Sequence, residues 1–171
     1  PYERGETQGR LFKSIIPDLL ERNLYSQLGN IDQGSLEDSR DKLLRFYSSR
    51  FPQIVEEIRG IADGTGLPFS RILDWDFQAI LLLDLFPRQE ESCTSIRLRT
   101  LDGEIIHAGS LDSGSPDGSH LVKRVSPETG QSYAGGMLVG TTWTTFGMNS
   151  VGLTVGGSSV NSSRTSQETC L

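Results

Sequence analysis

The sequence changes character near residue 92, and this change restricts the chain to a fold that joins a helical part to a β part. Residues 1–92 contain 17 Gly, Ser and Thr residues and 27 charged residues, whereas residues 93–171 contain 35 and 11. Apolar residues recur at helical spacing before the change and alternate with polar residues after it. The sequence therefore predicts an α+β protein, with a helical N-terminal half followed by an antiparallel sheet.

Helix signals recur through the first half. The predicted helices are an apolar stripe from Leu11 to Leu20 that Pro17 interrupts, a helix behind a capping box at Ser35 and Asp38, a helix over Pro52–Ala62 that Gly64 closes, and a helix from Ser70 through Leu81. In the Pro52–Ala62 helix, the apolar residues share one face. We expect Glu56, Glu57 and Arg59 on its opposite, solvent-facing side.

The second half predicts strands joined by short turns. The predicted strands are Cys93–Thr100, Glu104–Ala108, His120–Val125, Ser132–Val139, Thr142–Phe146 and Leu153–Val155. Asp102-Gly103 predicts a two-residue type I′ turn, in which both central residues have positive φ. This hairpin should return the chain to the neighbourhood of Cys93.

Charge and composition exclude several classes of function. The formal net charge is −6, which argues against a nucleic-acid-binding surface. The longest apolar run, Ala79–Leu83, is too short to span a membrane. Cys93 and Cys170 are far apart and lie in no metal-binding motif, so we expect no disulfide framework and no metal. No organic cofactor is expected, since the chain lacks nucleotide-binding glycine motifs and also lacks GxSxG.

The chain ends carry a separate expectation. No secretory leader precedes the first helical pattern, and the sequence stops directly after a Ser-rich stretch. We therefore expect the sequence to be a piece of a longer chain, truncated at the C-terminus. The sequence predicts no cellular compartment.

Cys93 is the most informative candidate for chemistry, because it stands where the helical pattern gives way to the first strand. If the bond between Ser92 and Cys93 were cut, the new α-amino group could accept the thiol proton, since its reference pKa is roughly 7.7–8.0. No catalytic histidine is then required, and His107 and His120 lie in no recognisable catalytic motif. The alternative is a small buried side chain at a strand end.

Two polar residues are further candidates. Asp112 lies on the loop after the return strand, where a carboxylate could hold the α-ammonium group or orient a substrate amine. Asn149 lies in the turn Gly147-Met-Asn-Ser-Val-Gly-Leu153 and could contact a substrate. Both residues are also common in turns, so a purely local role for each remains open.

Four motifs in order resemble one family. They are the glycine-containing opening Arg4-Gly5…Gly9-Arg10, the run Glu57-Ile-Arg-Gly-Ile-Ala-Asp-Gly-Thr-Gly-Leu67, the strand start Cys93-Thr-Ser-Ile96 and the turn Gly147–Leu153. Over essentially its whole length the chain resembles the acyl-coenzyme A:isopenicillin N acyltransferase family, the peptidase C45 group of N-terminal nucleophile (Ntn) hydrolases. Its cysteine motif also resembles the acid ceramidase and N-acylethanolamine acid amidase group.

The resemblance implies an αββα sandwich, formed as a precursor and cut between Ser92 and Cys93. Residues 1–92 would become the helical α-chain and residues 93–171 the start of the catalytic β-chain, the two forming one domain and a heterodimer. Cys93 would be the nucleophile for autocleavage and for acyl transfer. It would attack the carbonyl of a small N-acyl amide or acyl thioester and form a thioester acyl-enzyme.

The resemblance also assigns the remaining site residues. Asp112 matches the family's acid after the hairpin. Ser110 stands in the same substrate-binding motif where members usually carry Asn, and Ala108 where they carry Gly. An oxyanion-hole Asn and a late Arg are expected beyond residue 171. A non-catalytic or truncated relative, and an α+β binding module without turnover, are the alternative readings.

Overall fold

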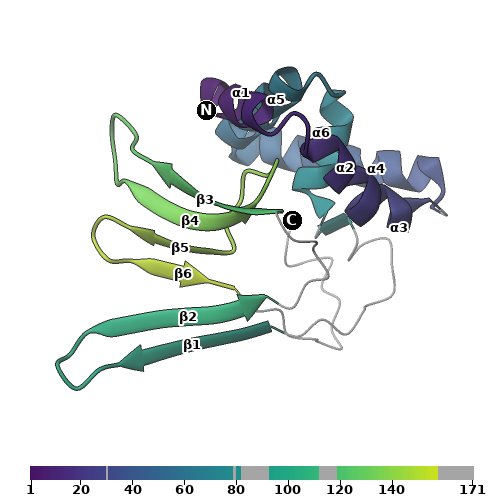
Figure 1. Ribbon diagram of the computed structural model, residues 1–171. Helices are drawn as coiled ribbons and strands as arrows, with labels where there is room; N and C mark the ends of the chain where they lie inside the picture. The colour runs from purple at the N-terminus through teal and green to yellow at the C-terminus, as the bar shows by residue number, and fades with distance from the viewer. Residues whose placement is uncertain (30, 79, 82–92, 112–118, 158–171) are drawn as a thin grey trace. The chain divides into compact units, whose positions relative to one another are not determined.

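The computed structural model describes residues 1–29, 31–78, 80–81, 93–111 and 119–157. The chain divides into two compact units (Figure 1). The helical unit comprises residues 1–88 together with the short segment Val139–Trp143, and the sheet unit comprises residues 89–138 and 144–171. Helices occupy the first half of the described chain and antiparallel strands the second, so the α+β prediction is confirmed.

The helical unit is built around one apolar core. Its elements are α1 (Tyr2–Leu11), α2 (Ile16–Leu20), the π-helical turn η1 (Glu21–Tyr25), α3 (Ser26–Leu28), α4 (Gln33–Arg50), α5 (Pro52–Thr65) and α6 (Phe69–Asp76). Side chains buried in the core include Ile16, Leu20, Leu24, Leu36, Ile58, Ile61, Leu73 and Trp75. None of the helices in the described part of the chain is long and apolar enough to cross a membrane.

Helices α1 and α5 pack through two pairs of glycines, each pair spaced four residues apart. A Cβ added at Gly5 would lie 2.0 Å from the carbonyl oxygen of Glu57, and one at Gly9 would lie 2.4 Å from that of Ile61. The contact is reciprocal, because a Cβ at Gly60 would lie 2.1 Å from the carbonyl oxygen of Tyr2. The two backbones therefore approach more closely than any residue with a side chain would allow.

The ends of α4 and α5 differ from the prediction by a few residues. Asp32 is the N-cap of α4, and its carboxylate accepts the backbone N–H of Ser35 at 2.9 Å. The predicted capping box at Ser35 and Asp38 is therefore wrong in register by three residues. Helix α5 ends at Gly66, whose φ of 77° only glycine adopts readily. Gly64, the predicted end, packs on α1 instead.

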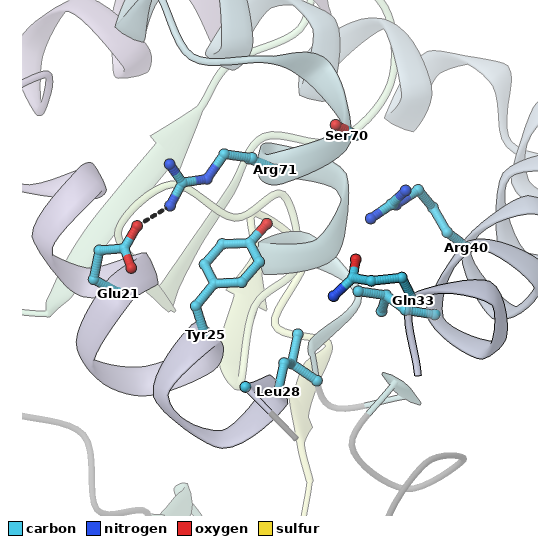
Figure 2. A pocket seen from close by; sticks show the side chains of 9 residues that line it. Glu21, Tyr25, Leu28, Gln33, Arg40, Ser70 and Arg71 are labelled. Atoms are coloured by element: carbon cyan, nitrogen blue, oxygen red, sulfur yellow. Dashed lines mark hydrogen bonds and ion pairs between the residues drawn. The ribbon is translucent and has the colours of Figure 1, made fainter. Parts of the chain in front are cut away.

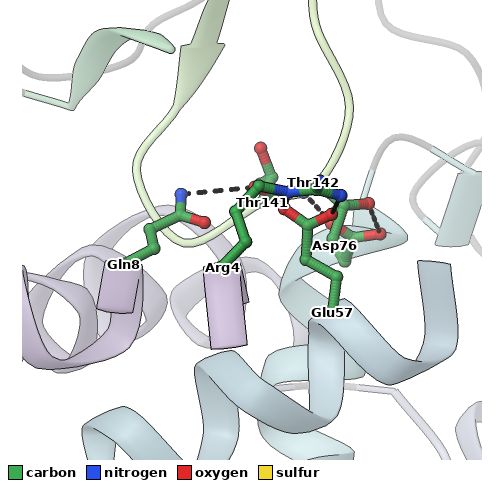
Figure 3. Close-up of polar contacts among 6 residues, drawn as sticks. All are labelled: Arg4, Gln8, Glu57, Asp76, Thr141 and Thr142. Atoms are coloured by element: carbon green, nitrogen blue, oxygen red, sulfur yellow. Dashed lines mark hydrogen bonds and ion pairs between the residues drawn. The ribbon is translucent and has the colours of Figure 1, made fainter. Parts of the chain in front are cut away.

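Two further helix predictions need correction. Pro68, not Ser70, precedes α6, and no side chain caps this helix. Glu57, expected in solvent, is buried on α5 with 3% of its surface exposed. Its carboxylate accepts two hydrogen bonds from the guanidinium of Arg4 on α1, which compensates the buried charge (Figure 3). Pro17 behaves as predicted, since it lies in the first turn of the restarted helix α2.

The segment Val139–Trp143 is held in the helical unit by hydrogen bonds to α1 and α6. The indole N–H of Trp75 donates to the carbonyl of Val139 at 2.8 Å. Asp76 accepts the backbone N–H and the hydroxyl of Thr142, and the amide of Gln8 donates to the carbonyl of Thr141 (Figure 3). The strand predicted at Thr142–Phe146 is therefore wrong in all but its last residue, and the observed strand covers Phe146–Asn149.

The described residues of the sheet unit form two antiparallel sheets. The first is the hairpin of β1 (Cys93–Arg99) and β2 (Ile105–Leu111). The second has the order β3-β4-β5-β6, with β3 His120–Val125, β4 Tyr133–Leu138, β5 Phe146–Asn149 and β6 Thr154–Gly156. The bounds of β3 agree with the prediction, and those of β1, β2, β4 and β6 differ from it by one to three residues at their ends.

The β1–β2 and β5–β6 hairpin turns have the same three-residue geometry. Thr100 pairs with Glu104 across the first turn, and Gly103, with φ of 93°, closes it. Asn149 pairs with Leu153 across the second turn, where Gly152 has φ of 83°. Because Asp102 does not have positive φ, the predicted type I′ turn is wrong, and the turn is a type I turn followed by a left-handed glycine.

The glycine contact between α1 and α5 predicts that alanine destabilises the fold much more at Gly60 than at Gly29. Gly60→Ala should destabilise the fold by about 1–3 kcal/mol or more, because its Cβ would meet rigid backbone. Gly29→Ala is the matched control. Its Cβ would meet only the carbonyl oxygen of Tyr25, at 3.5 Å, and its φ of −58° suits alanine. Urea unfolding of both variants measures the difference; equal effects would contradict the close packing.

Candidate functional site

The candidate site begins at the open end of the β1–β2 hairpin. The two strands pair over seven residues, and Cys93, the first residue of β1, lies opposite Leu111, the last residue of β2. The predicted return of the hairpin to Cys93 is therefore present in the backbone register. Ser92 and Asp112 are the next residues along the chain on either side of this pair, and both lie outside the described residues.

Ser110 lies one step inward from this end. It pairs with Thr94, and its side chain is exposed to solvent. Because directly opposed residues of an antiparallel pair share a face, Ser110 and Thr94 lie on one face of the hairpin.

Asn149 has a local partner in the turn between β5 and β6. Its side-chain Oδ1 accepts the backbone N–H of Leu153 at 2.8 Å and that of Val151 at 3.2 Å. The turn lies at the same end of the sheet unit as the β1–β2 turn (Figure 1), whereas Cys93, the first residue of β1, lies at the other end of the β1–β2 hairpin. Cys93 and Asn149 are therefore not brought together.

Two residues that sequence reasoning left without a role come together on the hairpin. The hydroxyl Oγ of Ser95 is 3.0 Å from Nε2 of His107, which is a hydrogen bond. Ser95 pairs with Gly109 and His107 with Arg97, so the two side chains meet diagonally across the ladder. The signal in the sequence was the spacing: in a hairpin with seven cross-strand pairs, this serine and this histidine fall on one face.

Glycine makes room for the imidazole ring. A Cβ added at Gly156 on β6 would lie 2.8 Å from Cε1 and 3.0 Å from Nε2 of His107. A Cβ added at Gly109 would lie 2.5 Å from the ring of Phe146. These contacts place β2 against β6 and the start of β5 and fix where the ring of His107 lies. No cluster of three metal-ligating side chains occurs among the described residues.

A separate cavity of about 470 Å³ opens in the helical unit (Figure 2). Its wall carries two arginines, each bound to a carboxylate. The guanidinium of Arg40 donates to both oxygens of Asp74, at 2.7 and 2.8 Å, and Asp74 is fully buried. Arg71 pairs with Glu21 and lies over the ring of Tyr25, with its Cζ 4.6 Å from the ring centroid.

The charged side chains around this cavity are paired with one another. The hydroxyl of Tyr25 donates a third hydrogen bond to Asp74, at 3.1 Å. The hydrogen bond from Arg40 to Asp74 raises the pKa of that guanidinium, so Arg40 stays charged. Asp74 is therefore a buried carboxylate whose three hydrogen bonds join η1, α4 and α6.

Tyr25 makes the stability of this junction depend on pH. Burial, followed by the charge of Asp74 and the hydrogen bond to it, raises the pKa of Tyr25 to about 12. Because the unfolded value is about 10, the contribution of Tyr25 should be present below pH 10 and lost as the pH rises toward 12. Urea unfolding of wild type and Tyr25→Phe should show a stability difference that shrinks across this range; a constant difference would contradict it.

Asn149 can be assigned to the turn or to a substrate site by two variants. Asn149→Ala should lower stability by roughly 0.5–1.5 kcal/mol, because it removes the acceptor for two backbone N–H groups. Asn149→Asp keeps that acceptor and should retain the stability, which thermal unfolding measures. A raised KM in a stable Asn149→Asp variant would contradict the turn assignment and return this residue to the substrate site.

In comparisons with known proteins, no protein-family model matches this sequence and no curated protein matches it. The function is therefore inferred from the motifs of this chain and from the geometry of its hairpin.

Proposed function

We propose that this protein is an autoprocessing cysteine amidohydrolase or acyltransferase of the Ntn type, similar to the C45 family. The observation that carries the proposal is the register of the hairpin, in which Cys93 opens β1 opposite the last residue of β2. A nucleophile at the first position of a strand becomes the N-terminal residue once the bond before it is cut. Asp112 follows Leu111 directly in the sequence, which supports its assignment as the acid of the site.

Cleavage gives Cys93 its own general base. The freed α-amino group, with a reference pKa of roughly 7.7–8.0, is partly neutral near pH 7 and accepts the thiol proton. The thiolate then attacks an amide or thioester carbonyl and forms a thioester acyl-enzyme. The α-ammonium group returns its proton to the departing amine or thiol. Water or an amine takes the acyl group in the second step.

The sheet unit supports the finer fold assignment in one respect. Ile96, Leu98 and Ile106 lie on one face of the β1–β2 hairpin, and each is about half exposed, at 47%, 57% and 48%. Apolar side chains on a sheet face are typical of a face that packs on another layer. An αββα sandwich supplies such a layer. In the proposed protein, residues 1–92 form the α-chain and the segment beginning at Cys93 forms the β-chain.

The cleavage is tested by the mass of the full-length protein. Wild type should appear as two fragments, the second beginning at Cys93, and Cys93→Ala should remain one chain because the nucleophile is lost. Cys170→Ala, which removes the other cysteine, is the control and should cleave as wild type does. N-terminal sequencing of the second fragment identifies the cut. An uncut wild-type chain, unreactive toward a thiol-directed acyl analogue, would favour a non-catalytic relative or a binding module.

The acceptor of the acyl group is a second question for the cleaved protein. N-acyl amides and acyl thioesters serve as donors, with and without hydroxylamine as a competing acceptor. Formation of free acid alone identifies a hydrolase, whereas acyl hydroxamate identifies a transferable acyl-enzyme. Neither product from any donor would contradict the proposed activity.

A further inference from the structure

We propose that the cavity of the helical unit binds a small organic carboxylate, a molecule with one anionic group and an apolar body. The cavity has a volume of about 470 Å³, which lies in the range of ordinary small-molecule sites. All of its lining residues belong to the helical unit and to the described part of the chain. The β1–β2 hairpin takes no part in it, so the proposal goes beyond the cleavage at Cys93 and is independent of it.

Two guanidinium groups supply the positive charge of the cavity wall. In Figure 2 they lie on either side of the hydroxyl of Tyr25. Arg40 is bound to the buried carboxylate of Asp74 through Nε and Nη2, and its Nη1 makes no hydrogen bond to a described residue. Because Asp74 fixes the orientation of this planar group in advance, a ligand that accepts from Nη1 does not have to order it.

The ion pair of Arg71 is open to exchange. Its partner, Glu21, lines the cavity and has 61% of its side chain exposed. An ion pair with so exposed a partner contributes little to stability. A carboxylate brought in by a ligand can therefore replace that of Glu21 on the guanidinium. The stacking of Arg71 on the ring of Tyr25 holds the guanidinium in place during this exchange.

The start of α6 also favours an anion in the cavity. Ser70 and Arg71 lie in the first turn of this helix, and the N-terminus of a helix carries the positive end of its dipole. The hydroxyl of Ser70 and the amide of Gln33 add neutral donors to the wall. Two carboxylates oppose an anion here. They are Glu21, which the ligand replaces, and Asp74, which already accepts three hydrogen bonds.

The rest of the wall carries no charge and favours an organic acid over an inorganic anion. Leu28, Gly29 and Leu36 line this part together with the ring of Tyr25. Arginine binds carboxylate and phosphate with similar geometry, so the guanidinium groups alone do not distinguish the two. A phosphate ion would fill only a small part of the cavity, whereas an organic acid also places apolar carbon against the uncharged wall.

The backbone of η1 is a separate observation that points to the same cavity. Glu21 and Tyr25 are the first and last residues of this π-helical turn, and both line the cavity. π-Helical turns are rare and occur frequently at functional sites. In the proposed site, this turn presents both the carboxylate that the ligand replaces and the ring that supports Arg71.

The test is isothermal titration calorimetry of the full-length protein with two probe acids, phenylacetate and hexanoate. At least one acid should bind saturably to wild type. Phenylacetamide, which lacks the charge, and inorganic phosphate, which lacks the apolar body, should bind roughly tenfold more weakly or not at all. Failure of both acids to bind would overturn the proposal, and so would equal binding of the amide. Phosphate binding as tight as that of the acids would overturn the choice of an organic ligand.

Two variants locate the binding site. Arg71→Gln removes the cation and should weaken binding roughly tenfold. Glu21→Gln removes the competing carboxylate and should strengthen binding by roughly two- to fivefold, a gain that a purely structural ion pair would not produce. Arg22→Gln and Asp18→Asn are the matched controls, because they break a similarly exposed ion pair that does not line the cavity. Both controls should bind as wild type does.

Circular dichroism verifies that each variant is folded. Unchanged affinity in folded Arg71→Gln, or weaker binding in folded Glu21→Gln, would overturn the proposed site. None of these outcomes bears on the proposed cleavage, which the mass of the protein tests separately.

Discussion

The close contact between α1 and α5 is the constraint on which the helical unit depends. Gly5, Gly9, Gly60 and Gly64 let two backbones approach to a distance that excludes any side chain. This approach sets the position of the other residues of α1. Arg4 reaches the buried carboxylate of Glu57, and Gln8 reaches the carbonyl of Thr141. A small separation of the two helices at the glycines would therefore weaken the hydrogen bonds of these polar groups. Their burial costs free energy unless they stay paired.

Buried polar groups give the helical unit its specificity. Asp74 and Asp76 are two residues apart at the end of α6 and have different tasks. Asp74 accepts from Arg40 and Tyr25 and joins three helical segments, whereas Asp76 accepts from Thr142 in the segment after β4. Each carboxylate has several donors, so its buried charge is compensated. An apolar core alone would not select between alternative placements of these segments.

The sequence predicted element types well and element ends less well. The apolar periodicity of Pro52–Ala62 identifies α5, because burial of one face determines the helix. The cap of α4 at Asp32 and the end of α5 at Gly66 were missed, because several nearby residues have equal capping ability and only the final backbone geometry chooses among them. Glu57 was predicted in solvent because its partner, Arg4, is distant in sequence.

For the candidate site too, the sequence predicted the elements but not the contacts between side chains. The alternation around Asp102-Gly103 was enough to predict a hairpin that returns to Cys93. It did not reveal the pair of Ser95 and His107, because a diagonal contact depends on the exact register, which the turn geometry determines. Asn149 was equally compatible with a turn or a substrate contact, and only its bonds to Val151 and Leu153 place it in the turn.

The segment Val139–Trp143 has a consequence for the proposed cleavage. It lies on the C-terminal side of the bond between residues 92 and 93, yet it belongs to the same compact unit as residues 1–88. Cutting that bond would leave the hydrogen bonds of Trp75, Asp76 and Gln8 to this segment in place. The two products would therefore stay associated without a covalent link, since one of them supplies an integral piece of the other's interior.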